Sequence, residues 1–144
     1  PTDGAAACLL MSEEAAKRFG LTPLATLTGH ASAGVDPKRM GISPSPSLQK
    51  LFKKTGTSMN DYDLLELNEA FAAQVLAVEK EIPIDHERLN VNGGAIALGH
   101  PTGCTGARLV VTLLHEMKKR KAKRGIATLC ISGGLGLAVS FDRV

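Results

Sequence analysis

The sequence is poor in aromatic residues: 3% of its 144 residues are aromatic, with one Tyr and no Trp. A hydrophobic fraction of 44% still supports one packed core of aliphatic side chains, because a chain near this length buries roughly 68–70% of its unfolded surface. Disorder and a collagen-like structure are therefore excluded. The chain has three cysteines, an odd number at wide spacing, which excludes a disulfide scaffold and favours a reducing compartment.

Long apolar runs are also lacking. No stretch reaches the length of a membrane span, and the first residues, PTDGAAACLLMSEE, have no basic flank of the kind found in signal peptides. The net charge is a mild +3, and much of it lies in a basic run, 118–124, that suits the C-terminus of a helix. That run contains no aromatic residues, so we expect no nucleic-acid partner. We expect a soluble cytoplasmic protein, with a mitochondrial location as the alternative.

The sequence opens on Pro1 and enters an apolar segment within a few residues. Such a beginning is typical of the interior of a larger sequence, although removal of a tag or leader is an alternative explanation.

Strand-like and helix-like segments alternate along the chain, which predicts the α/β class. A helix after Ser12 has a serine N-cap and ends at Gly20, and Gly56 ends a helix that begins near Pro46. Expected strands are 5–11, 24–35, 62–67 and a glycine-turn hairpin of 126–131 with 135–141; expected helices are 12–19, 45–54, 68–82 and 107–121, and a glycine-dense loop spans 90–106.

Polar residues interrupt this pattern where strands or helices end, which is where α/β proteins build their sites. His100 lies between Gly99 and Pro101. Its side chain is suited to proton transfer near neutral pH. The alternative is a structural histidine that only satisfies backbone groups of the loop. Cys130 ends an apolar strand at a glycine-rich turn. Two interpretations fit this position: a reactive thiol next to backbone N–H groups, or a buried and unreactive cysteine. Asn68 is either a helix N-cap or a catalytic amide that positions a water.

Other kinds of site find no support in the spacing of residues. The glycines of 99–106 do not match the dinucleotide fingerprint, and that loop has no phosphate-binding lysine. Metal ligation is not expected, because paired cysteines and helical histidine pairs are missing.

Three long segments together resemble signatures of the thiolases, the acetyl-CoA acetyltransferase family. They are LLELNEAFAAQ, NVNGGAIALGHPTGCTGARLVVTLLHE and GIATLCISGGLGLAV, and the resemblance extends over essentially the whole chain. It implies a thiolase-like fold, in which two halves, each a mixed sheet with covering helices, form a duplicated five-layered α-β-α-β-α structure. Residues 1–23 are then the closing strand and helix of the first half, and 24–144 form the C-terminal half.

The resemblance also implies roles for individual residues. His100 would help to deprotonate the acyl-accepting cysteine and contribute to the oxyanion hole, and Asn68 would hold the water that completes this hole. Cys130 would be the acid/base that takes the α-proton of the second acetyl group. The backbone N–H of Ser132 would serve a second oxyanion hole. Substrate-lining residues implied in the same way are Met40, Ala70 and Phe71.

The chain departs from the family pattern at three positions. The family usually has Gly at the position of Ser132, Gln or Met at that of Leu135, and Ala at that of Cys104. Neither Cys104 nor Cys8 lies in a motif that matches the family's nucleophilic cysteine, which belongs to the first half of the fold.

The expected activity is that of a thiolase acyltransferase in fatty-acid metabolism: condensation of two acetyl-CoA to acetoacetyl-CoA, or thiolysis of 3-ketoacyl-CoA in reverse. CoA thioesters are then substrates, and no cofactor is expected. We expect the isolated chain to be inactive without an N-terminal thiolase half, and the complete enzyme to be a homodimer or homotetramer. The alternative is a non-catalytic half-domain for assembly or acyl-CoA binding.

Overall fold

A four-stranded mixed sheet forms the centre of the chain, in a computed structural model that describes residues 2–144; Pro1, at which the sequence opens, lies outside them. The strand order is β1-β4-β3-β2, with β1 and β3 antiparallel to β4 and β2 parallel to β3. The strands are β1 (Ala25–Gly34), β2 (Leu64–Leu67), β3 (Arg124–Cys130) and β4 (Leu135–Arg143). The α/β class with covering helices and the β3–β4 hairpin are both confirmed.

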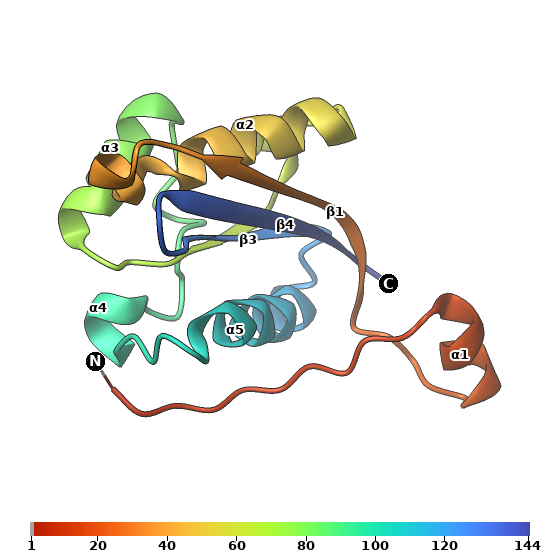
Figure 1. The fold of residues 1–144 in the computed structure, drawn as a ribbon. Helices are drawn as coiled ribbons and strands as arrows, with labels where there is room; N and C mark the ends of the chain where they lie inside the picture. The colour runs from red at the N-terminus through yellow and green to blue at the C-terminus, as the bar shows by residue number, and fades with distance from the viewer. Residues whose placement is uncertain (1) are drawn as a thin grey trace.

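Helices cover both faces of this sheet (Figure 1). Helices α2 (Pro44–Thr55) and α3 (Ala72–Glu81) lie on one face, and α5 (Thr105–Arg120) lies on the other. The remaining helices are α1 (Glu13–Arg18), α4 (Ala95–Leu98) and two short 3-10 turns, η1 (Pro37–Ile42) and η2 (Met59–Asp61). None of the helices described is long and apolar enough to cross a membrane.

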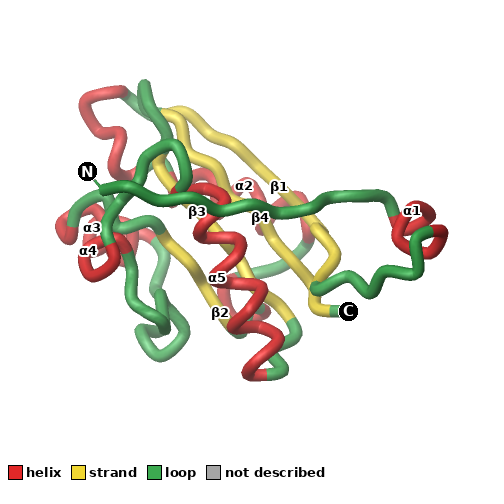
Figure 2. The backbone as a smooth tube through the Cα atoms, turned by 90° about the horizontal axis from the view of Figure 1, so that it is seen from below, coloured by secondary structure: helices red, strands yellow, loops and turns green. Residues whose placement is uncertain are grey.

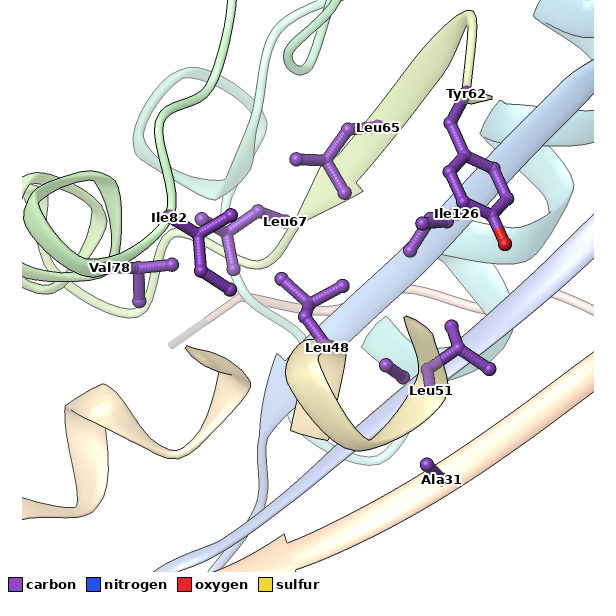
Figure 3. Close-up of a cluster of buried hydrophobic side chains, with 10 residues drawn as sticks. Ala31, Leu48, Leu51, Tyr62, Leu65, Leu67, Val78, Ile82 and Ile126 are labelled. Atoms are coloured by element: carbon purple, nitrogen blue, oxygen red, sulfur yellow. The ribbon is translucent and has the colours of Figure 1, made fainter. Parts of the chain in front are cut away.

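Each face of the sheet has its own hydrophobic cluster. Figure 3 shows the first cluster, in which Leu48 and Leu51 of α2 lie against side chains of β2 and β3, including Leu67 and Ile126. Leu64 belongs instead to the second cluster, beneath α5. Successive side chains of a strand point to opposite faces, so the three buried leucines of β2 are divided between the two clusters.

The parallel pair β2–β3 determines where the polar segments meet. Leu67 is paired with Thr128, so both strands end at the same edge of the sheet. Asn68 follows β2 at this edge, and Cys130 ends β3 beside it. The architecture therefore brings together two residues that lie far apart in the sequence.

The expected strand at 5–11 is wrong for this structure. The segment is extended but forms no strand, and Leu9 and Leu10 are 81% and 73% exposed. It crosses α5 on the side away from the sheet, so it lies along neither sheet edge and has no backbone ladder to join (Figure 2). The helix after it is confirmed, because the Ser12 hydroxyl caps the Ala15 N–H at 3.1 Å.

Several expected helix starts are also displaced. α2 begins at Pro44 and α5 at Thr105, each slightly earlier than expected, and the short α4 forms inside the glycine-dense loop. α3 begins at Ala72 and not at Asn68, because the Asn68 N–H donates to the Thr128 carbonyl at 3.0 Å and continues the ladder of β2. Asn68 is therefore not a helix cap.

Candidate active site

Asn68 and His100 meet although 32 positions separate them. Nδ2 of Asn68 lies 3.3 Å from Nε2 of His100. Asn68 is completely buried, and His100 follows α4 in the glycine-dense loop. The structure thus brings two of the predicted site residues into direct contact.

Thr105, at the start of α5, fixes the His100 ring from its other side. Thr105 Oγ1 lies 2.7 Å from His100 Nδ1 and donates its proton to the Pro101 carbonyl at 3.0 Å. A hydroxyl has a single proton, so Oγ1 accepts from Nδ1–H. In the neutral ring Nε2 is then the unprotonated nitrogen, and it accepts from the Asn68 amide. This arrangement leaves one basic nitrogen on the Asn68 side.

Asn90 anchors the end of β2. Its Oδ1 accepts from the Leu67 N–H and its Nδ2 donates to the Leu67 carbonyl, both at 2.9 Å. Asn90 has a φ of 46°, a left-handed conformation that asparagine tolerates better than most residues. The same Nδ2 donates to Glu69 Oε1 at 2.9 Å. The Asn90 side chain therefore satisfies the backbone groups of Leu67 in place of a neighbouring strand, and it also orients the Glu69 carboxylate.

Glu69 connects this anchor to the segment before His100. Its Oε2 accepts from the Ile96 N–H at 3.0 Å, near the N-terminus of α4. Its carboxylate occupies the space that a Cβ on Gly94 would take. α4 leads through Gly99, at a φ of 97°, directly to His100. Glu69 and Asn90 were not found by sequence reasoning, which assigned roles to Asn68, Ala70 and Phe71 of this motif but none to Glu69.

Cys130 is partly exposed at the end of β3. Burial raises the pKa of the Cys130 thiol above its ordinary value. Gln74 of α3 is 5% exposed, and its Oε1 accepts from the Ala70 N–H at 3.1 Å. Gln74 therefore fixes the segment between Asn68 and α3, a role that no sequence motif indicated.

The other predicted residues lie around this centre. Ser132 is exposed in the β3–β4 turn, whose Gly133 and Gly134 have φ values of 66° and 85°. Phe71 is 64% exposed at the start of α3. Met40 is 40% exposed on η1, which packs against α3 and β3. Met40 and Phe71 are thus exposed apolar side chains on η1 and at the start of α3, two elements that pack against each other.

A buried ion pair lies behind the site. Glu66 of β2 is 2% exposed, and its Oε2 lies 3.0 Å from Nη1 of Arg108 on α5. Burial raises the pKa of Glu66 to about 7, although the Arg108 charge and hydrogen bond act in the opposite direction. Glu66 is therefore a second titratable group, on the face of β2 toward α5.

An open cavity of about 410 Å³ lies next to the His100 loop. Its walls are the N-terminal segment 2–6 and the loop 101–104, which includes Cys104. Among residues 2–144, no three His, Cys, Asp or Glu side chains gather in a way that could hold a metal ion. The polar side chains of the candidate site are an imidazole, an amide and a thiol, a set suited to proton transfer and to stabilising an oxyanion.

Comparison with protein families gives this geometry a context. The model of the thiolase C-terminal domain matches residues 21–143. The chain belongs to the thiolase family.

Curated thiolase relatives agree along almost the whole chain. It is 55% identical over 141 residues to the acetyl-CoA acetyltransferase of Cupriavidus necator and 57% identical over 141 residues to that of Pseudomonas aeruginosa. Each alignment covers 98% of this chain and 36% of the relative. The chain thus spans about a third of the length of these thiolases.

Solved thiolase structures show the same fold. The acetyl-CoA acetyltransferase of Bacillus anthracis superposes with a TM-score of 0.91 at 56% identity, over 93% of this chain and 34% of that one. Human mitochondrial 3-ketoacyl-CoA thiolase in complex with CoA gives a TM-score of 0.89 at 47% identity, over 92% of this chain and 34% of that one. The thiolase-like fold expected from the sequence is therefore confirmed, whereas the division at residue 23 stays a prediction.

Proposed function

We propose that this chain supplies the His, Asn and acid/base Cys part of a thiolase active site. The reaction is condensation of two acetyl-CoA to acetoacetyl-CoA and CoA, or thiolysis of a 3-ketoacyl-CoA in reverse. The single observation that carries the proposal is the contact between buried Asn68 and half-buried His100, since it joins two separate motifs into one polar centre. Acetyl-CoA acetyltransferases among the relatives support the substrate class.

The geometry supports a division of roles. Thr105 orients the His100 ring through Nδ1, so Nε2 is the basic nitrogen that takes the proton of an acyl-accepting thiol. This transfer breaks the hydrogen bond that Nε2 accepts from the Asn68 amide. After that transfer, Nε2–H is a donor for the thioester oxygen, and Asn68 holds a water for the same oxygen. Forming a carbanion next to a thioester needs such donors where the negative charge develops.

Cys130 acts as the acid/base. As a thiolate it takes the α-proton of the second acetyl group: a new S–H bond forms, and the C–H electron pair becomes the enolate. The backbone N–H of Ser132 donates to the enolate oxygen, two residues beyond the thiol. Exposed Met40 and Phe71, with Ala70, line the acyl and pantetheine end of the pocket.

The nucleophilic cysteine comes from the first half of the fold, whether that half is joined to this chain or separate. Neither Cys8, exposed in the N-terminal segment, nor Cys104, in the cavity wall, lies in a matching motif. The 144 residues alone are then inactive, and the complete enzyme is a cytoplasmic or mitochondrial homodimer or homotetramer that uses CoA thioesters without a further cofactor.

A hybrid enzyme tests this proposal. In the Pseudomonas aeruginosa acetyl-CoA acetyltransferase, the matching third of the chain is replaced by residues 1–144, and cleavage of acetoacetyl-CoA by CoA is measured. We expect thiolysis by the hybrid and none by residues 1–144 alone. His100→Ala serves as the inactive control within the hybrid.

Two results would contradict the proposal. Turnover by the 144 residues alone overturns the dependence on a first half. A folded hybrid without turnover favours the alternative, a non-catalytic half-domain for assembly or acyl-CoA binding, which the departures at Ser132 and Leu135 would then explain.

A further inference from the structure

Ser43 joins η1 to α2, and its hydroxyl does not cap the helix that it precedes. Serine is favoured at this position because its oxygen usually accepts from an N–H in the first turn. Here Oγ instead donates to the carbonyl of Leu135, 92 positions away, at 3.0 Å. Ser43 is completely buried, so water does not compete for this hydrogen bond. The serine therefore connects α2 to the beginning of β4.

The Leu135 carbonyl is the main acceptor of the β3–β4 turn. It also accepts from the Ile131 N–H at 2.7 Å, and the Leu135 N–H donates to the Ser132 carbonyl at 3.3 Å. A carbonyl oxygen has two lone pairs. One of them serves the turn itself and the other serves Ser43, so the turn is held by a bond within it and by a bond from α2.

The backbone before α2 also packs closely against this turn. The carbonyl of Ser43 occupies the space that a Cβ on Gly136 would take. Ser47 Oγ donates to that carbonyl at 2.9 Å. The Val35 N–H donates to the Gly134 carbonyl, also at 2.9 Å. The segment 35–43 thus supports three successive residues of the hairpin, and the Ser43 hydroxyl makes the central contact.

The supported turn carries two of the proposed site residues. Cys130 is paired with Gly136 at the end of β3, and Ser132 follows in the exposed part of the turn. The Ser132 N–H has a fixed direction only while the peptide that contains it is fixed. Its carbonyl is bonded to the Leu135 N–H, so movement of Leu135 moves Ser132 as well.

We propose that Ser43 is a positioning residue that holds the Leu135 carbonyl and so keeps the Ser132 N–H aimed at the enolate oxygen while Cys130 takes the α-proton. This inference rests on the proposed function for the roles of Cys130 and Ser132. Ser43 touches neither the substrate nor the base. Its own N–H donates to the Met40 carbonyl at 3.1 Å, so it also sets the acyl wall of the pocket relative to the turn.

Amide hydrogen exchange of the 144-residue chain measures this effect without any acyl transfer. Opening of the turn separates Ile131 from the Leu135 carbonyl, and in the wild type this movement also breaks the bond to Ser43. In Ser43→Ala we therefore expect the amides of Ile131 and Leu135 to exchange about fivefold faster, the effect of one hydrogen bond.

Ser45→Ala is the matched control. Ser45 is as buried as Ser43 and lies two residues further along, but its hydroxyl donates to Glu81 of α3. This variant also loses one hydrogen bond of a buried serine, and it should leave the exchange of Ile131 and Leu135 unchanged. Equal acceleration in both variants would show a general loss of stability and would overturn the inference.

A second variant keeps the test decisive if Ser43→Ala fails to fold. Ser43→Gly also removes the hydroxyl, and glycine is tolerated at a helix N-cap. Far-UV circular dichroism shows that each variant is folded. Unchanged exchange at Ile131 and Leu135 in the folded variants overturns the role of Ser43.

Kinetics of the hybrid enzyme separate positioning from a merely structural role. In Ser43→Ala we expect the kcat of condensation to fall about tenfold, because a displaced oxyanion donor stabilises the transition state less. The KM for acetyl-CoA and the acetylation of the nucleophile should stay the same, since neither uses Ser132. An equal fall of acetylation and condensation would contradict the positioning role.

The two proposals fail in different ways. Unchanged exchange in the turn overturns the role of Ser43 whether or not the hybrid enzyme turns over. An inactive folded hybrid overturns the proposed function whatever the exchange rates are.

Discussion

His100 Nδ1 lies 2.7 Å from Thr105 Oγ1, and that hydroxyl donates onward to the Pro101 carbonyl. The three groups form a hydrogen-bonded chain in which the Thr105 hydroxyl donates its only proton to the Pro101 carbonyl. His100 must then donate from Nδ1, so the ring presents an unprotonated Nε2 to Asn68 when neutral. A threonine on α5 therefore determines which nitrogen of the histidine is basic.

Replacing Thr105 by the isosteric Val removes this control. The His100 ring loses its Nδ1 partner, so we expect nitrogen NMR of the 144-residue chain to show a mixture of tautomers. Thiolysis by the hybrid enzyme should fall about fivefold to tenfold, the effect of one lost hydrogen bond. Thr112→Val, about two helical turns further along α5, is the control. An unchanged tautomer in Thr105→Val would contradict the assignment.

The Glu66–Arg108 pair predicts a pH dependence of stability. Burial raises the pKa of Glu66 from its ordinary value of 4.5 to about 7 in the folded chain. A raised folded pKa means that the folded state binds the proton more tightly. The contribution of Glu66 to the free energy of unfolding is therefore fully present below pH 4.5 and is lost as the pH rises through about 7.

Glu66→Gln removes this titration but keeps an oxygen for Arg108. Thermal unfolding of the variant and the wild type, measured from about pH 4.5 to pH 8, should show the variant gaining about 3 kcal/mol relative to the wild type across the range. Glu87→Gln, at an exposed position, should follow the wild-type curve. Parallel curves for Glu66→Gln and the wild type would contradict the buried-carboxyl explanation.

Gly94 leaves the space in which the Glu69 carboxylate sits. In Gly94→Ala the methyl group displaces that carboxylate, which then releases both the Ile96 N–H and Asn90. We expect the Tm of the 144-residue chain to fall by about 5 °C, because the Asn90 amide and the Ile96 N–H lose their hydrogen bonds to Glu69. Turnover of the hybrid should fall at least about tenfold, since α4 leads directly to His100.

Gly106→Ala is the matched control for Gly94→Ala. A Cβ at Gly106 meets no atom within 4 Å, and the residue lies inside α5. Alanine is favoured over glycine in a helix, so the Tm of this variant should stay the same or rise slightly. Equal losses of stability in both variants would show that the space at Gly94 has no special role.

Local signals in the sequence predicted most of the fold. Ser12 caps α1 and Gly20 follows it with a φ of 64°, as their residue types indicate. Gly133 and Gly134 form the expected turn of the β3–β4 hairpin. The failures involve long-range contacts: Asn68 lies where an N-cap is expected, but its N–H extends the ladder to Thr128. An asparagine after a short apolar strand fits both a helix N-cap and a residue that continues the strand, so the local sequence does not distinguish them.

The site was predicted in part for a similar reason. His100, Asn68 and Cys130 lie in motifs that can be read along the chain. Gln74 and Thr105 are polar residues near helix starts, a position that is usually solvated. Their hydrogen-bond partners, Ala70 for Gln74 and His100 and Pro101 for Thr105, lie in the segment before each helix. Only the packing of α3 and α5 against the sheet shows that both are buried.

The role proposed for Cys130 predicts that its loss separates the two half-reactions. In the hybrid enzyme, Cys130→Ala removes the base for the α-proton, so condensation of acetyl-CoA should fall about a hundredfold to ten-thousandfold. Transfer of the first acetyl group to the nucleophile needs His100 and not Cys130, so mass spectrometry should still detect the acetylated enzyme. Cys104→Ala, which restores the residue common in the family, should retain both steps. Equal loss of acetylation and condensation in Cys130→Ala would show that the thiol supports the fold of the site and does not act as its base.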